Sequence, residues 1–179
     1  MHVSQKTAPT ADQPEKLPLH IPLDIELYDS EGNVIALQKD GSPVNNVLNV
    51  TAAEQTFVFD GVAHKPVPSL LREFSAPVKL DYPYSDQQLT FLMQHARNEF
   101  SRWDAAQSLL AIYIKLNVAK YQQKQPLSLP LHVADAFRAV LLDEQLDPAL
   151  AAQILTLPSE NEIAELFAIN RSASHFGGA

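Results

Sequence analysis

The feature that most constrains this chain is a change in the spacing of its apolar residues near Tyr82 and Pro83. Before this point, short alternating apolar runs are separated by turn residues, which is typical of β-strands. After it, apolar residues recur every three or four positions behind helix-capping residues, which is typical of α-helices. The spacing therefore predicts a mixed chain in which a β-sandwich of about seven strands precedes an α-helical array. We expect the sandwich over residues 1–82 and the helical segment over residues 83–167.

Prolines shape the start of the β half. Four of the 13 prolines lie within the first 22 residues, where their missing N–H groups and restricted backbones exclude helix. We expect one short edge strand and an extended loop over the first twenty residues. Strict alternation from His20 to Tyr28 then predicts a half-buried strand, with Ile21, Leu23, Ile25 and Leu27 on its apolar face and Pro22 at a sheet edge.

Turn residues divide the rest of the β half. Residues 29–33, which include Gly32, predict a hairpin between the first strand and the apolar run 34–37. A second polar turn is expected at residues 39–43. The remaining strands are expected at residues 47–50, 56–59, 70–74 and 78–80.

Capping signals divide the helical half. Ser85 and Gln88 form a capping box that opens a helix expected over residues 86–100. Asp104 is expected to cap a second helix that ends near residues 124–126. A third has its apolar face between Val133 and Leu141. Two further starts are indicated by Asp147 followed by Pro148, and by the capping box of Ser159 and Glu162.

Composition excludes several classes of function. The net charge is −8, and the 13 Lys and Arg residues never gather into a run, so a nucleic-acid partner is not expected. Without cysteine there can be no disulfide, thiolate metal site or cysteine nucleophile. The N-terminus has no signal-peptide pattern, and no window approaches 18 apolar residues, so no membrane span is expected. The cytoplasm is the expected compartment.

Two pairs of residues have the spacing of metal ligands on a helix. They are His132 with Asp135, three apart, and His95 with Glu99, four apart. Neither pair has a third ligand nearby in the sequence. We therefore interpret His132 and Asp135 as a solvated or intrahelical polar pair, and His95 and Glu99 as an exposed pair on a helix.

Other candidate motifs have simple structural interpretations. Asp29 begins a stretch that resembles the start of a calcium loop, but no Glu stands at its twelfth position, so a plain turn is expected. Asp143 and Glu144 are adjacent, so they point apart on a helix and are not expected to act as an acid–base pair. Trp103, the only tryptophan, is interpreted as a core anchor at a helix junction. No catalytic, cofactor-binding or metal-ligating residue is assigned.

Four long segments carry a family resemblance. They are PLHIPLDIELYDSEGNVI (residues 18–35), LLREFSAPVKLDY (70–82), SDQQLTFLMQHARNEFSRWDAAQSLL (85–110) and DAFRAVLLDEQLDPALAAQILTLPSE (135–160). In order and content they resemble the bacterial aminopeptidase N family of zinc-dependent alanyl aminopeptidases. The resemblance extends over about residues 2–167. It implies the β-sandwich third domain of that family, followed by the first helices of its α-helical fourth domain.

The same resemblance implies that the chemistry lies elsewhere. In the family, zinc is held by an HExxH helix and a downstream Glu, and a GxMEN segment helps to hold the substrate amine. None of these motifs occurs in this sequence. The chain thus resembles a non-catalytic fragment of a parent that removes N-terminal amino acids from peptides by zinc-dependent hydrolysis. Its implied partners are the remaining domains of the parent, and zinc is implied for the parent alone.

Two other hypotheses stay open. One is a stand-alone binding module, and the other is an enzyme that works with carboxylates but lacks any placed pair. The fragment hypothesis predicts exposed apolar faces on the helical half, around residues such as Leu109, Ile112 and Leu141, and self-association through them. Residues 168–179 depart from the family pattern, and we expect them to be a non-native or disordered tail.

Overall fold

In the computed structural model, which describes residues 1–165, the chain divides into a β unit, Met1–Pro83, and a helical unit that begins at Tyr84. Each unit is built around its own buried residues. The predicted order, β-strands followed by an array of α-helices, is confirmed.

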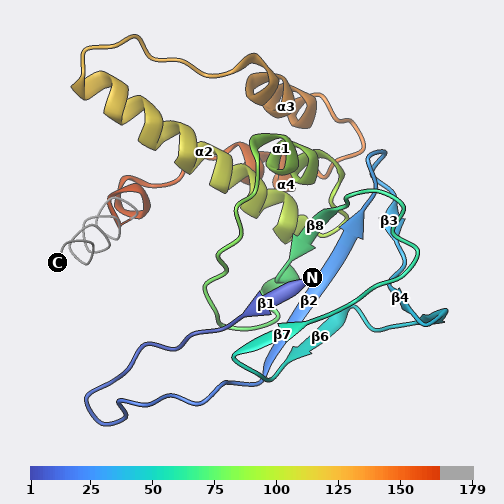
Figure 1. Ribbon diagram of the computed structural model, residues 1–179. Coiled ribbons are helices and arrows are strands. Elements are labelled where there is room, and N and C mark those ends of the chain that lie inside the picture. Colours follow the sequence, from blue (N-terminus) through green and yellow to red (C-terminus); the bar gives the residue numbers. More distant parts are fainter. Residues whose placement is uncertain (166–179) are drawn as a thin grey trace. The chain divides into compact units, whose positions relative to one another are not determined.

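Strand β2 (Ile21–Tyr28) is the centre of the β unit (Figure 1). Its first half pairs antiparallel with β6 (Val47–Val50), and its second half pairs with β8 (Val67–Leu70) and β3 (Val34–Ile35). Among the strand pairs of the described chain, Pro22 has a neighbour on one side only, as a residue without an N–H requires. The apolar face of β2 packs in a buried cluster with residues Leu37, Leu48, Val50, Leu71 and Ala76.

The other face of β2 is more buried than the alternation predicts. Glu26 is 7% exposed and Tyr28 is fully buried, although both were expected on the polar side of a half-buried strand. Both polar groups are paired where they are buried: Arg72, which follows β8, places its guanidinium 3.8 Å from the Glu26 carboxylate, and the Tyr28 hydroxyl donates to the same carboxylate. The expectation of a half-buried strand is therefore wrong at this end.

The predicted hairpin after β2 is confirmed. The Asp29 carboxylate accepts hydrogen bonds from the backbone N–H groups of Glu31 (2.8 Å) and Asn33 (2.9 Å), and Gly32 takes φ 89°. Hydrogen bonds from the side chain and backbone of Asn33 hold the pKa of Asp29 below its ordinary value. The carboxylate is thus used by the turn.

The shorter strands differ in place from several predictions. Strand β1 (His2–Ser4) pairs with β7 (Glu54–Thr56), so the strand expected at 56–59 lies earlier in the sequence. Strand β4 (Gln38–Lys39) pairs with β5 (Ser42–Pro43) across the second predicted turn.

The strands expected at 70–74 and 78–80 are wrong. Strand β8 ends at Leu70, and the 3-10 turn η1 (Arg72–Phe74) follows, because Leu71, Glu73 and Phe74 take positive φ angles that an extended strand excludes. Val78 donates its N–H to the carbonyl of Ala76 in a tight turn.

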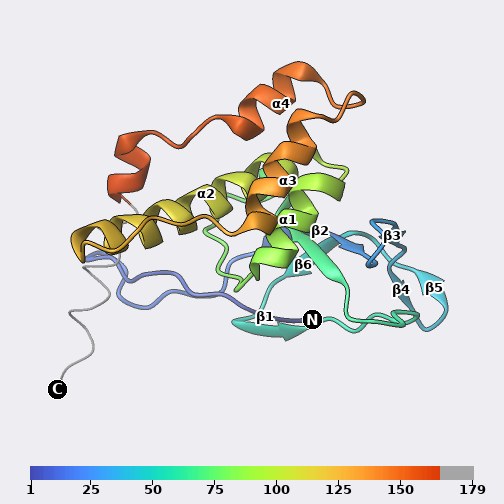
Figure 2. The ribbon, with the colours of Figure 1, turned by 90° about the horizontal axis from the view of Figure 1, so that it is seen from above.

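Four complete helices form the described part of the helical unit (Figure 2): α1 (Asp86–His95), α2 (Glu99–Gln122), α3 (Leu131–Leu141) and α4 (Pro148–Leu155). Residues 160–165 are also helical. Helix α1 packs against α2 and α3, and α4 packs against the same two helices. No helix of the described chain combines the length and the apolar character needed to cross a membrane.

Three of the four predicted caps are confirmed. Ser85 and Gln88 exchange hydrogen bonds as a capping box at α1. The Asp147 carboxylate accepts the N–H groups of Ala149 and Leu150 at α4. Ser159 and Glu162 form the third cap, in which Glu162 accepts from the Ser159 N–H at 2.7 Å.

The first helix boundary differs from the prediction. Helix α1 ends at His95 instead of residue 100, and Ala96 leaves the helix with ψ 134°. Asn98 then caps α2 by accepting the N–H of Ser101 at 3.0 Å, so Asp104 lies inside a helix rather than at its start. Helical spacing of apolar residues continues through this break, which is why the spacing does not reveal it.

Helix α2 ends in a Schellman motif. The Lys124 N–H donates to the carbonyl of Tyr121 (3.0 Å), and the Gln125 N–H donates to the carbonyl of Lys120 (2.9 Å). This geometry requires a left-handed residue at position 124, where Lys124 has φ 57°. A lysine pays a steric cost here that glycine does not have.

We predict that Lys124→Gly raises the free energy of unfolding by up to about 1 kcal/mol, because relief of left-handed strain exceeds the added entropy of the unfolded chain. Ala119→Gly, at an exposed position inside α2, is the matched control and should lower it by about 1 kcal/mol. Urea unfolding of both variants measures the difference. If Lys124→Gly loses about as much stability as the control, left-handed strain at Lys124 is contradicted.

Candidate functional site

Within residues 1–165 no group of three His, Asp or Glu side chains converges on a common point. The two pairs with ligand spacing are separated by the fold. His132 Nε2 lies 3.8 Å from Asp86 Oδ2 of α1, whereas Asp135 Oδ1 lies 3.9 Å from Arg138 Nη1. The intrahelical pairing of His132 with Asp135 is therefore wrong, because each residue lies nearer to another polar partner. Both side chains are about half exposed, as the solvated alternative expects.

His95 and Glu99 lie on different helices. His95 is the last residue of α1, and its ring packs at 4.8 Å from the ring of Phe91. Glu99 is the first residue of α2. Because the helix break lies between them, the predicted pair at helical spacing is also wrong.

The other candidates have structural roles. Arg102 donates from Nε to the Met93 carbonyl (2.9 Å) and places Nη2 3.7 Å from Asp143 Oδ2. Asp143 also accepts the N–H of Gln145 at 3.0 Å, so its carboxylate holds the loop after α3. Trp103 is half-buried near the start of α2, close to the junction where it was expected, and its ring lies 5.6 Å from that of Phe100.

A buried polar cluster lies in the β unit. The Arg72 Nη1 atom lies 3.5 Å from Asp24 Oδ1 and 3.8 Å from Glu26 Oε1, and the Tyr28 hydroxyl donates to Glu26. Arg72 exposes 18% of its side chain and Glu26 exposes 8%. Sequence alternation did not reveal this cluster, because Arg72 comes from a segment expected to be extended.

We predict that Arg72→Leu lowers the free energy of unfolding by about 3 kcal/mol, because the Glu26 carboxylate would remain buried without its cation. Arg138→Leu is the control, since its ion pair with Asp135 is exposed and should be worth less than about 1 kcal/mol. Chemical denaturation compares the two. Equal effects would show that burial does not set the strength of the Arg72 pair.

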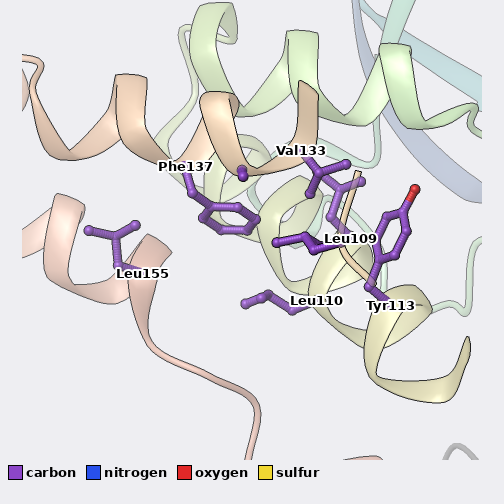
Figure 3. Close-up of a pocket in the computed structure, with 8 residues that line it drawn as sticks. Leu109, Leu110, Tyr113, Val133, Phe137 and Leu155 are labelled. Atoms are coloured by element: carbon purple, nitrogen blue, oxygen red, sulfur yellow. The ribbon is translucent and has the colours of Figure 1, made fainter. Parts of the chain in front are cut away.

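An apolar groove of about 400 Å³ lies in the helical unit (Figure 3). Side chains of α2, α3 and the end of α4 point toward it. It is lined by Leu109, Leu110, Tyr113, Leu129, Val133, Ala134, Phe137 and Leu155. Such a groove can bury an apolar ligand or the apolar face of a helix, but it has no nucleophile or acid–base pair.

The polar atom of the groove is already engaged. The Tyr113 hydroxyl donates a hydrogen bond to the Asp86 carboxylate, which also lies near His132. This hydrogen bond raises the pKa of Tyr113 to about 12, above its ordinary value of 10. The raised pKa means that the bond stabilises the fold fully below pH 10 and is lost as the pH rises toward 12.

We predict that Tyr113→Phe lowers the free energy of unfolding by about 1 kcal/mol at neutral pH. The variant should also lose less stability than the wild type between pH 10 and pH 12, the window set by the ordinary and raised pKa values. Tyr121→Phe, at a tyrosine that is 75% exposed, should change neither value. Urea titrations across this pH range measure the free energy of unfolding. If the wild type and Tyr113→Phe lose the same stability between pH 10 and pH 12, the prediction is contradicted.

Large apolar side chains are exposed on the helical unit. Leu109 is fully buried, but Leu141 is 66% exposed. The exposed members are Leu116, Tyr121, Leu127, Leu129, Leu131, Leu141, Leu142 and Leu157. Of the three positions at which exposure was expected, Leu141 is exposed, Ile112 is partly buried, and the expectation is wrong at Leu109 because α2, α3 and α4 pack around it. The groove that Leu129 shares with α2 was not expected.

Comparison with known proteins places these two units in a defined class. Residues 1–83 match a family model described as a domain of unknown function (DUF3458) with an Ig-like fold. Residues 86–175 match the model of its companion domain (DUF3458_C), described as ARM repeats. The chain belongs to this family, and the sandwich-then-helices fold class predicted from the sequence is confirmed.

The proteins similar to this chain are aminopeptidases. Aminopeptidase N of Escherichia coli is 77% identical over 93% of the chain, and aminopeptidase N of Haemophilus influenzae is 49% identical over 92%. The crystal structure of Legionella pneumophila aminopeptidase A in complex with aspartic acid matches with a TM-score of 0.67 and 34% identity, over 81% of this chain and 16% of that one. The chain spans about one fifth, 19%, of the length of the two aminopeptidase N relatives. The predicted resemblance to aminopeptidase N is confirmed.

Proposed function

We propose that this chain is a non-catalytic scaffold segment of an aminopeptidase N, whose parent enzyme is a zinc metalloprotease that removes N-terminal amino acids from peptides. The observation that carries the proposal is the 77% identity over 93% of the chain, set against 19% of the relative's length. Identity at this level supports the view that this chain has the same role as the matching segment of the Escherichia coli enzyme. The short coverage leaves most of the enzyme outside this sequence.

The donor groups of the described chain do not fit the zinc that the family implies. No three His, Asp or Glu side chains converge within residues 1–165, whereas a catalytic zinc needs three protein ligands. Asp29, Asp86 and Asp143 are held in a turn, between helices and in a loop. We therefore propose that zinc and the residues that activate water belong to other domains of the parent, which are the chain's partners.

The role that we propose for the segment is geometric. The β unit would serve as a spacer beside the catalytic domain, and the helical unit would begin the array that limits access to the active site. The apolar groove and the exposed leucines support this role, because helical repeats bury such faces against neighbouring repeats. We further propose the cytoplasm as the compartment in which the parent takes part in peptide catabolism.

We predict that the purified chain, supplied with zinc, does not hydrolyse an alanyl anilide above the rate of zinc in buffer. Full-length aminopeptidase N, assayed in parallel, is the positive control. Zinc-dependent turnover by this chain that a chelator abolishes would contradict the proposal.

The coding sequence on either side of this segment separates the fragment from a stand-alone module. An in-frame HExxH motif upstream supports the fragment. An in-frame stop codon directly upstream, together with inactive protein, would instead support a module that acts through binding.

A further inference from the structure

The sequence contains two Asp–Gly pairs, Asp40–Gly41 and Asp60–Gly61. In such a pair, the backbone nitrogen of the glycine can attack the side-chain carboxyl of the aspartate and close a succinimide ring. Glycine favours this attack, because it has no Cβ beside the nitrogen. All four residues are exposed, and the two glycines have φ angles of 74° and 73°. Exposure and glycine conformation therefore do not distinguish the two pairs.

Asp40 and Gly41 form the tip of the hairpin of β4 and β5 (Figure 2). Lys39 pairs with Ser42, so Asp40 and Gly41 are the two-residue loop, and both have positive φ angles, as a type I′ turn requires. A Cβ placed on Gly41 would have no heavy atom within 4 Å beyond its chain neighbours.

The two groups that would react at this tip are available. Among the described residues, no hydrogen bond or ion pair engages the Asp40 carboxylate. The same holds for the Gly41 N–H within the described chain. A type I′ turn selects a short polar side chain followed by glycine, and the same combination allows the ring to close.

Asp60 is held in place by the same hairpin. Its carboxylate accepts the backbone N–H of Asp40 at 2.5 Å, and its own N–H donates to the carbonyl of Gln38 at 2.8 Å. Ring closure with Gly61 would first have to break the hydrogen bond of the carboxylate, which is strengthened by its charge. The fold therefore protects the second Asp–Gly pair and leaves the first one open.

We propose that Asp40 is a site of spontaneous covalent modification, at which the folded chain forms isoaspartate. The Gly41 nitrogen bonds to Cγ of the neutral Asp40 carboxyl, and the hydroxyl group leaves as water with the amide proton. A water molecule then adds to the main-chain carbonyl carbon of Asp40. The bond from that carbon to the Gly41 nitrogen breaks, and the nitrogen takes a proton from the water. One water is released and one is consumed, so no other reactant is needed.

The product changes the hairpin. The main chain now runs through the Asp40 side chain and is longer by one methylene group, so the two-residue loop that sets the register of Lys39 with Ser42 is lost. The product also carries a free α-carboxylate. A methyltransferase specific for isoaspartate can esterify this group with S-adenosylmethionine as the methyl donor, which provides an assay.

Incubation of the full chain in mildly acidic buffer tests the proposal. Peptide mapping with electron-transfer fragmentation then measures isoaspartate separately at each site. Residue 40 should hold at least about tenfold more than residue 60, because reaction at Asp60 requires the loss of a hydrogen bond to a charged group. In the urea-unfolded chain the two residues should react similarly, because unfolding removes these contacts.

Asp40→Gly is the matched variant, because Gly–Gly also suits a type I′ loop and keeps the N–H that Asp60 accepts. It should lower methyl incorporation by the isoaspartate methyltransferase at least about tenfold, to the level that residue 60 contributes. Equal amounts of isoaspartate at residues 40 and 60 of the folded chain would overturn the proposal. Unchanged methyl incorporation in Asp40→Gly would overturn it too, as would a folded chain without isoaspartate at residue 40 after the unfolded chain has formed it.

Discussion

The carboxylate of Asp86 accepts a hydrogen bond from Tyr113 and lies 3.8 Å from His132, so one side chain connects α1, α2 and α3. The same constraint recurs through the chain: Asp29 closes a hairpin, and Asp143 holds the loop after α3. Each of these three carboxylates is engaged with partners in its own unit. In the described part of the chain, these three carboxylates maintain the local geometry.

The exposed apolar side chains of the helical unit also support a structural role for the described residues. The α2, α3 and α4 helices enclose Leu109 but leave a groove of about 400 Å³ beside it, and Leu141 and Leu142 are mostly exposed. In an ARM-repeat family, neighbouring repeats cover such faces. The exposed faces thus support the scaffold role proposed above.

Much of the fold could be predicted because its signals are local. The alternation of Ile21 to Leu27 and the caps at Ser85 and Asp147 act within a few residues, and the structure has all three. The predictions that were wrong depend on features that local spacing does not report, such as contacts between residues distant in the sequence. Arg72 covers Glu26 across 46 positions, and Asn98 interrupts a pattern that looks continuous. The groove could not be predicted either, because it depends on how three helices pack.

Metal content is the most direct test of the central claim, that this chain preserves geometry while the chemistry belongs to other domains. Native mass spectrometry of the purified chain, after incubation with zinc and exhaustive dialysis, reports the metal bound to the folded protein. We expect the mass of the polypeptide alone. One tightly held zinc ion per chain, lost when the chain is unfolded, would contradict the account.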